Sequence, residues 1–223
     1  MENTLYTVLT GDIVKSSRLS PADLRRLPEV LTTIFQSIDP VCKPAGFATR
    51  YSIFRGDSFQ LICEPACALK AWLIIRAGLR SNYPAPLSRS VDARIGIAVG
   101  KVDHLAGNIT ESSGEAFNLS GRLIETLKAP HLTAFTSGNS QTNRNLNIDL
   151  MFADDILRRW TTSQCRIVPF LLQSLNQSEI AKATKTRQPT VAAKVTAMGW
   201  NAFEHWMNYY IALTGESGSF TAP

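Results

Sequence analysis

The pattern of hydrophobic and polar positions divides the first two thirds of the chain into strands and helices. Short runs rich in β-branched and aromatic residues predict strands over residues 5–10, 47–54, 59–63, 91–99 and 132–135. Apolar residues that recur every three or four positions predict helices that begin at Ser20, Pro65 and Gly114. The first should be N-capped by Ser20 and irregular at Pro28. This order of elements, β-α-β-β-α-β-α-β, favours an α+β fold of the ferredoxin-like or palm type, with a mixed, mainly antiparallel sheet.

Two carboxylates are expected where predicted strands end. Asp12 follows the first strand, and Asp57 closes the turn Arg55-Gly56-Asp57 of a predicted β-hairpin. Ionised carboxylates accept hydrogen bonds only and suit hard cations such as Mg²⁺ or Mn²⁺. Asp is also common in turns for conformational reasons alone, so each residue taken singly is explained equally well as a turn former.

The third predicted helix carries a polar pair. Asn118 and Arg122 are four positions apart and therefore share one helix face. An amide and a planar guanidinium together match the oxygen atoms of a phosphate or a ribose. The alternative is a solvated pair near the start of the helix, without a ligand.

The composition changes near residue 149, where strand signals end and only helical patterns remain. This shift predicts a first domain over residues 1–148, a helical module over residues 149–214, and a disordered tail over residues 215–223. A helix over residues 153–174 is expected to bridge the two parts.

Residues 176–191 have the pattern of a helix-turn-helix unit. Ala181 is the small residue that allows two helices to cross closely, whereas Lys185 stands where the turn usually has a glycine. The candidate DNA-binding residues lie in the N-terminal half of the second helix: Arg187, Gln188, Thr190 and Lys194. Local charge is positive without forming a strong patch, so the predicted affinity for DNA is modest. A small helical packing or dimerisation module is the alternative.

Composition adds limits to these predictions. The 223 residues are 44% hydrophobic with a net charge of +5, which suits a globular protein with a mild preference for anionic partners. No run is long enough to span a membrane and no targeting segment is visible, so a cytoplasmic protein without a membrane partner is expected. The four cysteines match no zinc pattern and are expected to be reduced.

Four stretches, around Asp12, Asp57, residues 94–100 and residues 114–123, together resemble the catalytic domain of class III nucleotide cyclases. The best match is a glycine followed four positions later by Asn118 and eight positions later by Arg122. With the helical module included, most of the chain resembles the short bacterial SatD-type proteins, which pair such a domain with a helix-turn-helix.

The resemblance implies a site and a reaction. Asp12, Asp57 and the backbone carbonyl of Ile13 would hold two Mg²⁺ or Mn²⁺ ions. Asn118 would orient the ribose, and Arg122 would stabilise charge on the α-phosphate. The 3′-hydroxyl of a nucleoside triphosphate would attack that phosphate and release pyrophosphate. The family also implies a homodimer in which the two protomers share each site.

Two positions depart from the family pattern. Ile53 and Glu111 stand where many members place a lysine and an aspartate that read the purine base. The leading hypothesis is a metal-dependent nucleotide cyclase-like enzyme with a DNA-binding module. Ile53 favours the alternative, a nucleotide-sensing transcriptional regulator that binds nucleotide without turnover. A phosphoryl-transfer enzyme of another kind on a palm-like sheet is the third hypothesis.

Overall fold

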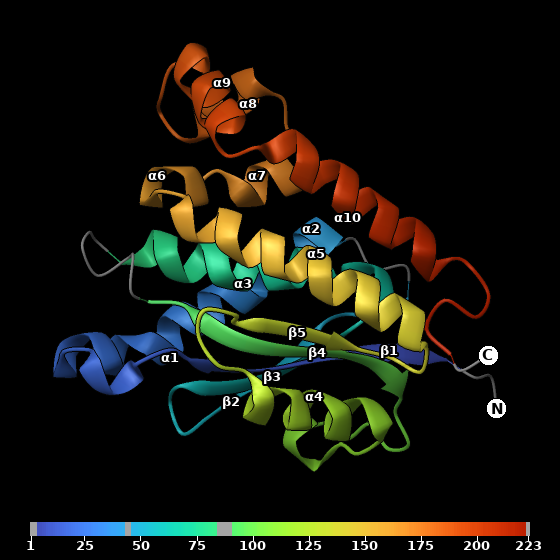
Figure 1. Ribbon diagram of the computed structural model, residues 1–223. Helices are drawn as coiled ribbons and strands as arrows, with labels where there is room; N and C mark the ends of the chain where they lie inside the picture. Colours follow the sequence, from blue (N-terminus) through green and yellow to red (C-terminus); the bar gives the residue numbers. More distant parts are fainter. Residues whose placement is uncertain (1–3, 43–45, 84–90, 222–223) are drawn as a thin grey trace.

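A single five-stranded sheet lies between helices on its two faces (Figure 1). The computed structural model describes residues 4–42, 46–83 and 91–221. The strands are β1 (Leu5–Ile13), β2 (Arg50–Phe54), β3 (Ser58–Cys63), β4 (Ala93–Lys101) and β5 (Thr133–Thr136). Their order is β2-β3-β1-β4-β5; β4 and β5 pair in parallel and all other neighbours are antiparallel. The predicted α+β fold with a mainly antiparallel sheet is therefore confirmed.

Helices cover the two faces unequally (Figure 1). In Figure 1, α3 (Ala68–Asn82) and α5 (Ser140–Arg159) lie above the sheet, and α1 (Pro21–Gln36) packs against α3 in the same core. The opposite face carries α4 (Glu115–Thr126). The remaining helices lie above α3 and α5 and are short, except for the last two: α6 (Thr162–Cys165), α7 (Val168–Leu172), α8 (Gln177–Ala183), α9 (Gln188–Ala197) and α10 (Trp200–Thr214). Connecting turns are η1 (Ser16–Arg18), α2 (Asp39–Cys42), η2 (Pro65–Cys67) and η4 (Ile109–Glu111).

The alternation of side chains along β1 divides the buried residues into two clusters. Leu9 and Ile13 belong to the large core under α1 and α3, whereas Val8 belongs to a small cluster that includes Ala116 and Phe117 of α4. Because successive strand residues point to opposite faces, Thr10 and Asp12 lie on the same face as Val8. Asp12 thus points to the α4 side of the sheet.

Local signals at α1 agree with the structure in part. The Ser20 hydroxyl accepts a hydrogen bond from the Asp23 amide at 3.1 Å, as an N-cap does. Pro28 lies inside the helix, which nevertheless runs without interruption to Gln36. The expected irregularity at Pro28 does not divide the helix.

The polar segment before residue 148, in which no helix was predicted, is the first half of α5. Asn139 caps this helix by accepting hydrogen bonds from the Gln141 and Thr142 amides. Asn143 and Asn147 then hydrogen-bond the backbone of Ser137 and Phe135 beside β5. These amide side chains satisfy backbone groups next to the last strand, which is why a helix packed on the sheet can be so polar here.

The helix expected over residues 153–174 is also corrected. It is divided among the end of α5, α6 and α7. Thr161 starts a new helix, because its hydroxyl accepts from the Gln164 amide while the Gln164 side chain accepts from the Thr161 amide.

The hydrophobic core continues across the expected domain boundary. Residue 149 lies in the middle of α5, and Phe203, Met207 and Tyr210 of α10 belong to the same buried cluster as the sheet. Phe220, in the segment expected to be a disordered tail, is 5% exposed and packs against Phe135 and Tyr210. The described part of that segment, up to residue 221, is therefore anchored on the core.

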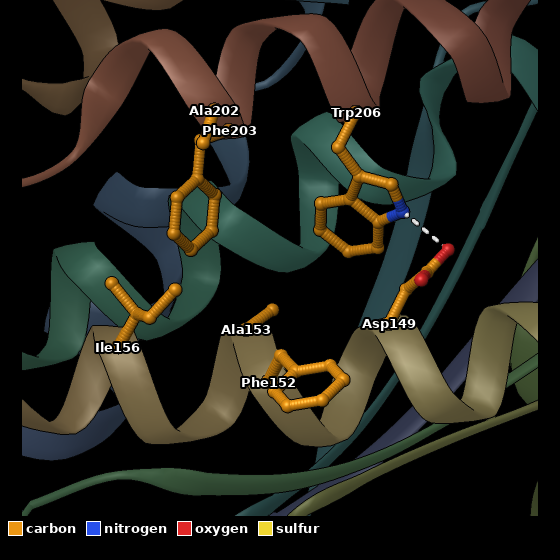
Figure 2. Close-up of a pocket in the computed structure, with 7 residues that line it drawn as sticks. All are labelled: Asp149, Phe152, Ala153, Ile156, Ala202, Phe203 and Trp206. Atoms are coloured by element: carbon orange, nitrogen blue, oxygen red, sulfur yellow. Dashed lines mark hydrogen bonds between the residues drawn. The ribbon is translucent and has the colours of Figure 1, made fainter.

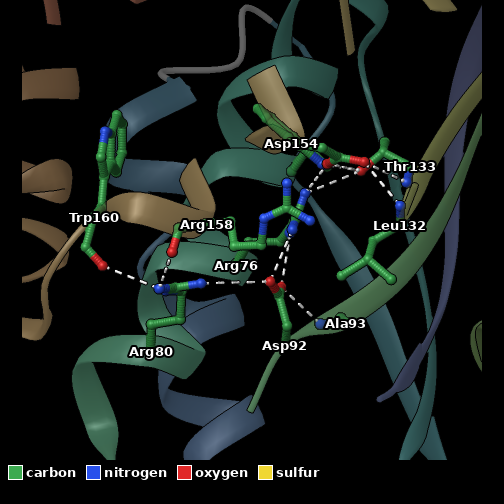
Figure 3. Close-up of polar contacts among 10 residues, drawn as sticks. Arg76, Arg80, Asp92, Ala93, Leu132, Thr133, Asp154, Arg158 and Trp160 are labelled. Atoms are coloured by element: carbon green, nitrogen blue, oxygen red, sulfur yellow. Dashed lines mark hydrogen bonds and ion pairs between the residues drawn. The ribbon is translucent and has the colours of Figure 1, made fainter. Parts of the chain in front are cut away.

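A buried ionic network joins α3, the sheet and α5 (Figure 3). Arg76, 1% exposed, pairs with Asp92 at 2.7 Å and with Asp154 of α5. Asp154 also accepts hydrogen bonds from the Leu132 and Thr133 amides at the start of β5. These contacts raise the pKa of the Arg76 guanidinium despite its burial. Each charge in the network has a partner, as a buried charge requires.

Two cysteines differ from the sequence expectation. Cys42 and Cys67 form a disulfide that links α2 to η2, with their Cα atoms 5.3 Å apart, so the expectation that all thiols are reduced is wrong. Cys63 and Cys165 are free and buried.

Among the described helices, none combines the length and the apolar character that a membrane crossing requires.

Candidate functional site

The backbones that carry Asp12 and Asp57 are neighbours. β1 extends to Ile13, so Asp12 lies inside the strand rather than after it, and it faces Ser58 of β3 across the antiparallel pair. The Ile13 amide donates a hydrogen bond to the Asp57 carbonyl at 2.9 Å. The structure therefore brings the two acidic residues and Ile13 to one end of the β1–β3 ladder.

Arg94 is the direct partner of Asp12. The two residues face each other in the β1–β4 register, and the guanidinium binds both carboxylate oxygens, with Nε donating to Oδ1 at 2.9 Å and a second nitrogen to Oδ2. The side chains are 37% and 26% exposed, so solvent reaches the pair. These hydrogen bonds from Arg94 to Asp12 raise the pKa of the guanidinium.

Asp57 has different partners. Its Oδ2 accepts a hydrogen bond from the Ser16 hydroxyl at 2.6 Å, and its Oδ1 accepts from Ser58 at 3.4 Å. Ser16 belongs to η1, the turn that follows β1. The hairpin loop that presents Asp57 has three residues between Phe54 and Ser58, and two of them have positive φ, Arg55 at 56° and Gly56 at 81°.

The face around Asp12 presents a row of half-buried polar side chains, here called the open polar patch. Its members alternate with core residues along β1, β2 and β3: Thr10, Asp12, Ser52, Ser58 and Gln60. On one side α4 borders the patch, because the Ser120 hydroxyl hydrogen-bonds that of Thr10 at 2.7 Å. The patch supplies hydroxyl, amide and carboxylate groups on an accessible surface.

The donor set at Asp12 and Asp57 fits a hard divalent cation in its chemistry. Each carboxylate oxygen has two lone pairs, and the contacts described above leave acceptor capacity on both residues. In the described part of the chain no group of three or more His, Cys, Asp or Glu side chains is placed to hold a metal. A cation at this position would depend on two carboxylates and backbone oxygen, and it would compete with Arg94 for Asp12.

Asn118 and Arg122 lie elsewhere in the same protomer. Both are exposed on α4, which buries Ala116, Phe117 and Ser120 against the sheet. Ser120 lies midway between them in sequence, two positions from each, so their side chains project from the opposite side of the helix. One protomer therefore does not bring Asn118 and Arg122 to its own Asp12.

The two expected base-reading positions are separated from Asp12. Ile53 packs against the large core, on the other face of the sheet. Glu111 is exposed in η4, next to Ile109, which is buried in the cluster around Val8. Val8 precedes Asp12 by four strand residues, a separation of about 13 Å.

The candidate DNA-binding residues lie on α9 at the top of Figure 1, far from the sheet. The residues of segment 184–187 join α8 to α9, and Lys185 has a φ of 52°, the left-handed conformation in which a glycine is usual. Arg187, Gln188 and Thr190 are exposed at the start of α9. Lys194 instead lines a cavity with Arg166 and Phe170, on the side of α9 that faces α6 and α7.

Sequence reasoning missed Arg94 as a partner of Asp12, and it also missed Ser16 and the polar residues of the patch. The alternation of side chains along β4 puts Arg94 on the face opposite Ala93 and Ile95, which belong to the large core. The signal that was lacking is the register between β1 and β4, which pairs residues 82 positions apart.

Comparisons with known proteins give structural similarity only. No protein-family model and no curated protein matches the chain. The structure of an adenylate/guanylate cyclase/hydrolase from Silicibacter pomeroyi shares 23% identity with this chain at a TM-score of 0.46. The match covers 67% of this chain and 82% of that one. A guanylyl cyclase domain from the aquatic fungus Blastocladiella emersonii shares 23% identity at a TM-score of 0.42, over 60% and 81%.

A bacterial light-regulated adenylyl cyclase shares 21% identity at a TM-score of 0.43, over 60% of this chain. This chain spans 44% of the length of that protein. At these identities and scores the similarities assign no activity to the chain, so the functional argument below depends on its own residues.

Proposed function

We propose that this protein binds a nucleoside triphosphate at the open polar patch and converts it to a cyclic nucleotide and pyrophosphate. The observation that carries the proposal is the meeting of Asp12, Ile13 and Asp57 at one end of the β1–β3 ladder. Two carboxylates and a backbone carbonyl suit the divalent cation that accompanies a triphosphate. Asp12, Asp57 and the Ile13 carbonyl would hold Mg²⁺ or Mn²⁺, which would supply polarisation of the phosphate oxygens.

A second protomer completes the proposed site. Asn118 and Arg122 project away from the sheet of their own chain, so they meet Asp12 and Asp57 only across a two-fold interface. There the Asn118 amide would orient the ribose, and the Arg122 guanidinium would stabilise charge on the α-phosphate. Ile53 is on the other face, so recognition of the base falls to neutral polar groups of the patch such as Ser52 and Gln60.

A second candidate function is supported by the ion pair of Asp12. Arg94 occupies both oxygens of that carboxylate, which weakens cation binding and favours a protein that senses a nucleotide without turnover. In both cases α8 and α9 would act as a DNA-binding module, with Arg187, Gln188 and Thr190 exposed toward the duplex. Lys194 lies on the cavity side of α9 and contributes less.

The decisive experiment is incubation with each ribonucleoside triphosphate and Mn²⁺, followed by separation of cyclic nucleotide and pyrophosphate. Formation of cyclic nucleotide and pyrophosphate by the unmodified protein, lost in the Asp57→Asn variant, supports the cyclase activity. Saturable binding without product supports the sensor, and absence of both contradicts the nucleotide site. Separately, binding to mixed-sequence duplex should weaken as salt rises and should weaken further in Arg187→Ala.

A further inference from the structure

A cavity of about 190 Å³ opens between α5 and α10, outside the proposed nucleotide site (Figure 2). Its wall on α5 consists of Asp149, Phe152, Ala153 and Ile156, and its wall on α10 consists of Ala202, Phe203 and Trp206. An engineered apolar cavity of about 150 Å³ is large enough to bind benzene. The space between the two helices therefore admits one aromatic ring with a small head group.

The aromatic walls of the cavity are held in place. Phe203 is 3% exposed and packs against Trp160, and Trp206 meets Trp72 edge-on with the ring centroids 6.0 Å apart. Figure 2 shows Phe203 and Trp206 pointing from α10 toward α5. Phe152 is different, because 68% of it is exposed. A ligand in the cavity would cover part of that ring.

Asp149 is the charged residue among those described along this cavity. Its Oδ2 accepts a hydrogen bond from the Trp206 indole at 3.1 Å, and none of the described residues donates a hydrogen bond to its Oδ1. The carboxylate is thus fixed beside the Trp206 ring, in a cavity that Phe152 and Phe203 also line, and it keeps one oxygen for a ligand. Aromatic faces and a carboxylate attract the same partner, a cation, and they attract it more strongly when it carries apolar groups.

A second copy of the chain is a poor occupant of this surface. Two-fold pairing through the exposed face of α5, centred between Met151 and Phe152, would bring Arg144 of one helix opposite Arg159 of the other. Like charges opposite each other oppose such pairing. The charge of the cavity itself is negative, which favours a small cation over a symmetrical protein contact.

We infer that the cavity between α5 and α10 is a binding site for a small organic cation with an aromatic or branched alkyl body, held by Asp149, Phe152 and Trp206. The ligand would contact both the helix that packs on the sheet and the helix that follows α9. The inference does not depend on the nucleotide site.

The test compares benzyltrimethylammonium with neopentylbenzene, which has the same shape without the charge. Binding is followed by calorimetry and by the indole N–H resonance of Trp206, identified with Trp206→Phe. We expect saturable binding of the cation, about five-fold tighter than that of the neutral compound, since a cation–π contact and a partly exposed ion pair contribute about 1 kcal/mol together.

Asp149→Asn keeps the shape of the side chain and its acceptor for Trp206, and it should reduce the preference for the cation to the part that the aromatic rings contribute. Glu204→Gln, on α10 but lining another cavity, is the matched control for net charge and should bind as the unmodified protein does. Ala202→Leu, at an exposed lining position, should exclude both compounds. Equal affinities for the two compounds, an unchanged Asp149→Asn variant, or no response of the Trp206 resonance would overturn the inference.

Discussion

Asp12 and Arg94 face each other across β1 and β4, and the guanidinium of one binds both carboxylate oxygens of the other. The same carboxylate is the first expected ligand of a divalent cation. In the proposed site, Arg94 would therefore compete with the cation for this carboxylate.

This relationship predicts a gain of metal affinity when the arginine is neutralised. Arg94→Gln should bind Mn²⁺ about five-fold more tightly in the absence of nucleotide, because a nearby unit positive charge disfavours the ion by about 1 kcal/mol even at high effective dielectric. Titration followed by the electron paramagnetic resonance of free Mn²⁺ measures the change. Arg50→Gln, an exposed arginine on β2 at the far end of the same face, serves as the control and should change little. Weaker binding in Arg94→Gln would show that the pair does not compete with metal.

The buried network in Figure 3 predicts a large difference between two adjacent aspartates. Asp154→Ala leaves Arg76 without one of its two carboxylates and removes the acceptor of the Leu132 and Thr133 amides, at a cost of about 4 kcal/mol. Asp155→Ala removes only pairs with Arg158 and Arg159 at a site 52% exposed, at a cost below about 1 kcal/mol. Urea unfolding measures both free energies. Similar losses in the two variants would mean that the network contributes no more than a surface pair.

The turn between α8 and α9 predicts a stabilising substitution. Lys185 has a φ of 52° in a helix C-terminal motif, where the Thr186 amide donates to the Ala181 carbonyl. Lys185→Gly should raise the free energy of unfolding by about 1 kcal/mol, because glycine adopts this conformation without the steric penalty of a Cβ atom. Lys185→Ala keeps the Cβ atom and the penalty, so thermal unfolding should show no comparable gain for it. Equal effects of the two substitutions would assign the change to the lost charge instead.

The cysteines predict a definite pattern of thiol titration. Burial raises the pKa of the Cys165 thiol to about 11 and also raises that of the Cys63 thiol, so both remain protonated and enclosed at pH 8. A thiol reagent should therefore find almost no reactive group in the native protein at pH 8. It should find the two free cysteines after unfolding, and all four after unfolding with reductant. Four reactive thiols in the unfolded protein without reductant would contradict the Cys42–Cys67 disulfide.

Local chemistry was enough to predict much of the fold. Ser20 marks the start of α1, the turn around Gly56 marks the hairpin, and Gly114, with a φ of 149°, precedes α4. Each of these signals operates within a few residues. The backbones of Asp12 and Asp57 are neighbours because one short hairpin and one strand determine their register.

What the sequence could not predict depends on contacts between distant residues. Helix α5 looks like a loop because Asn143 and Asn147 are polar, yet they bond backbone beside β5. Phe220 lies in a segment expected to be a frayed tail, but its ring packs against those of Phe135 and Tyr210. The pairing of Arg94 with Asp12 depends on strand register, which no local pattern specifies.

The most direct test of the shared nucleotide site mixes two inactive variants. The Asp57→Asn variant lacks a carboxylate proposed to hold the cation, and the Arg122→Ala variant lacks the guanidinium proposed to contact the α-phosphate. Neither homodimer should therefore form cyclic nucleotide. If each site draws Asp57 from one protomer and Arg122 from the other, random mixing after exchange of protomers gives half heterodimers, each with one intact site, and about a quarter of the original activity. A control mixture of Asp57→Asn with Asp12→Asn should stay inactive, since both changes affect the same side of the site. Activity restored in the control, or none restored in the first mixture when the unmodified protein is active, would contradict the shared site.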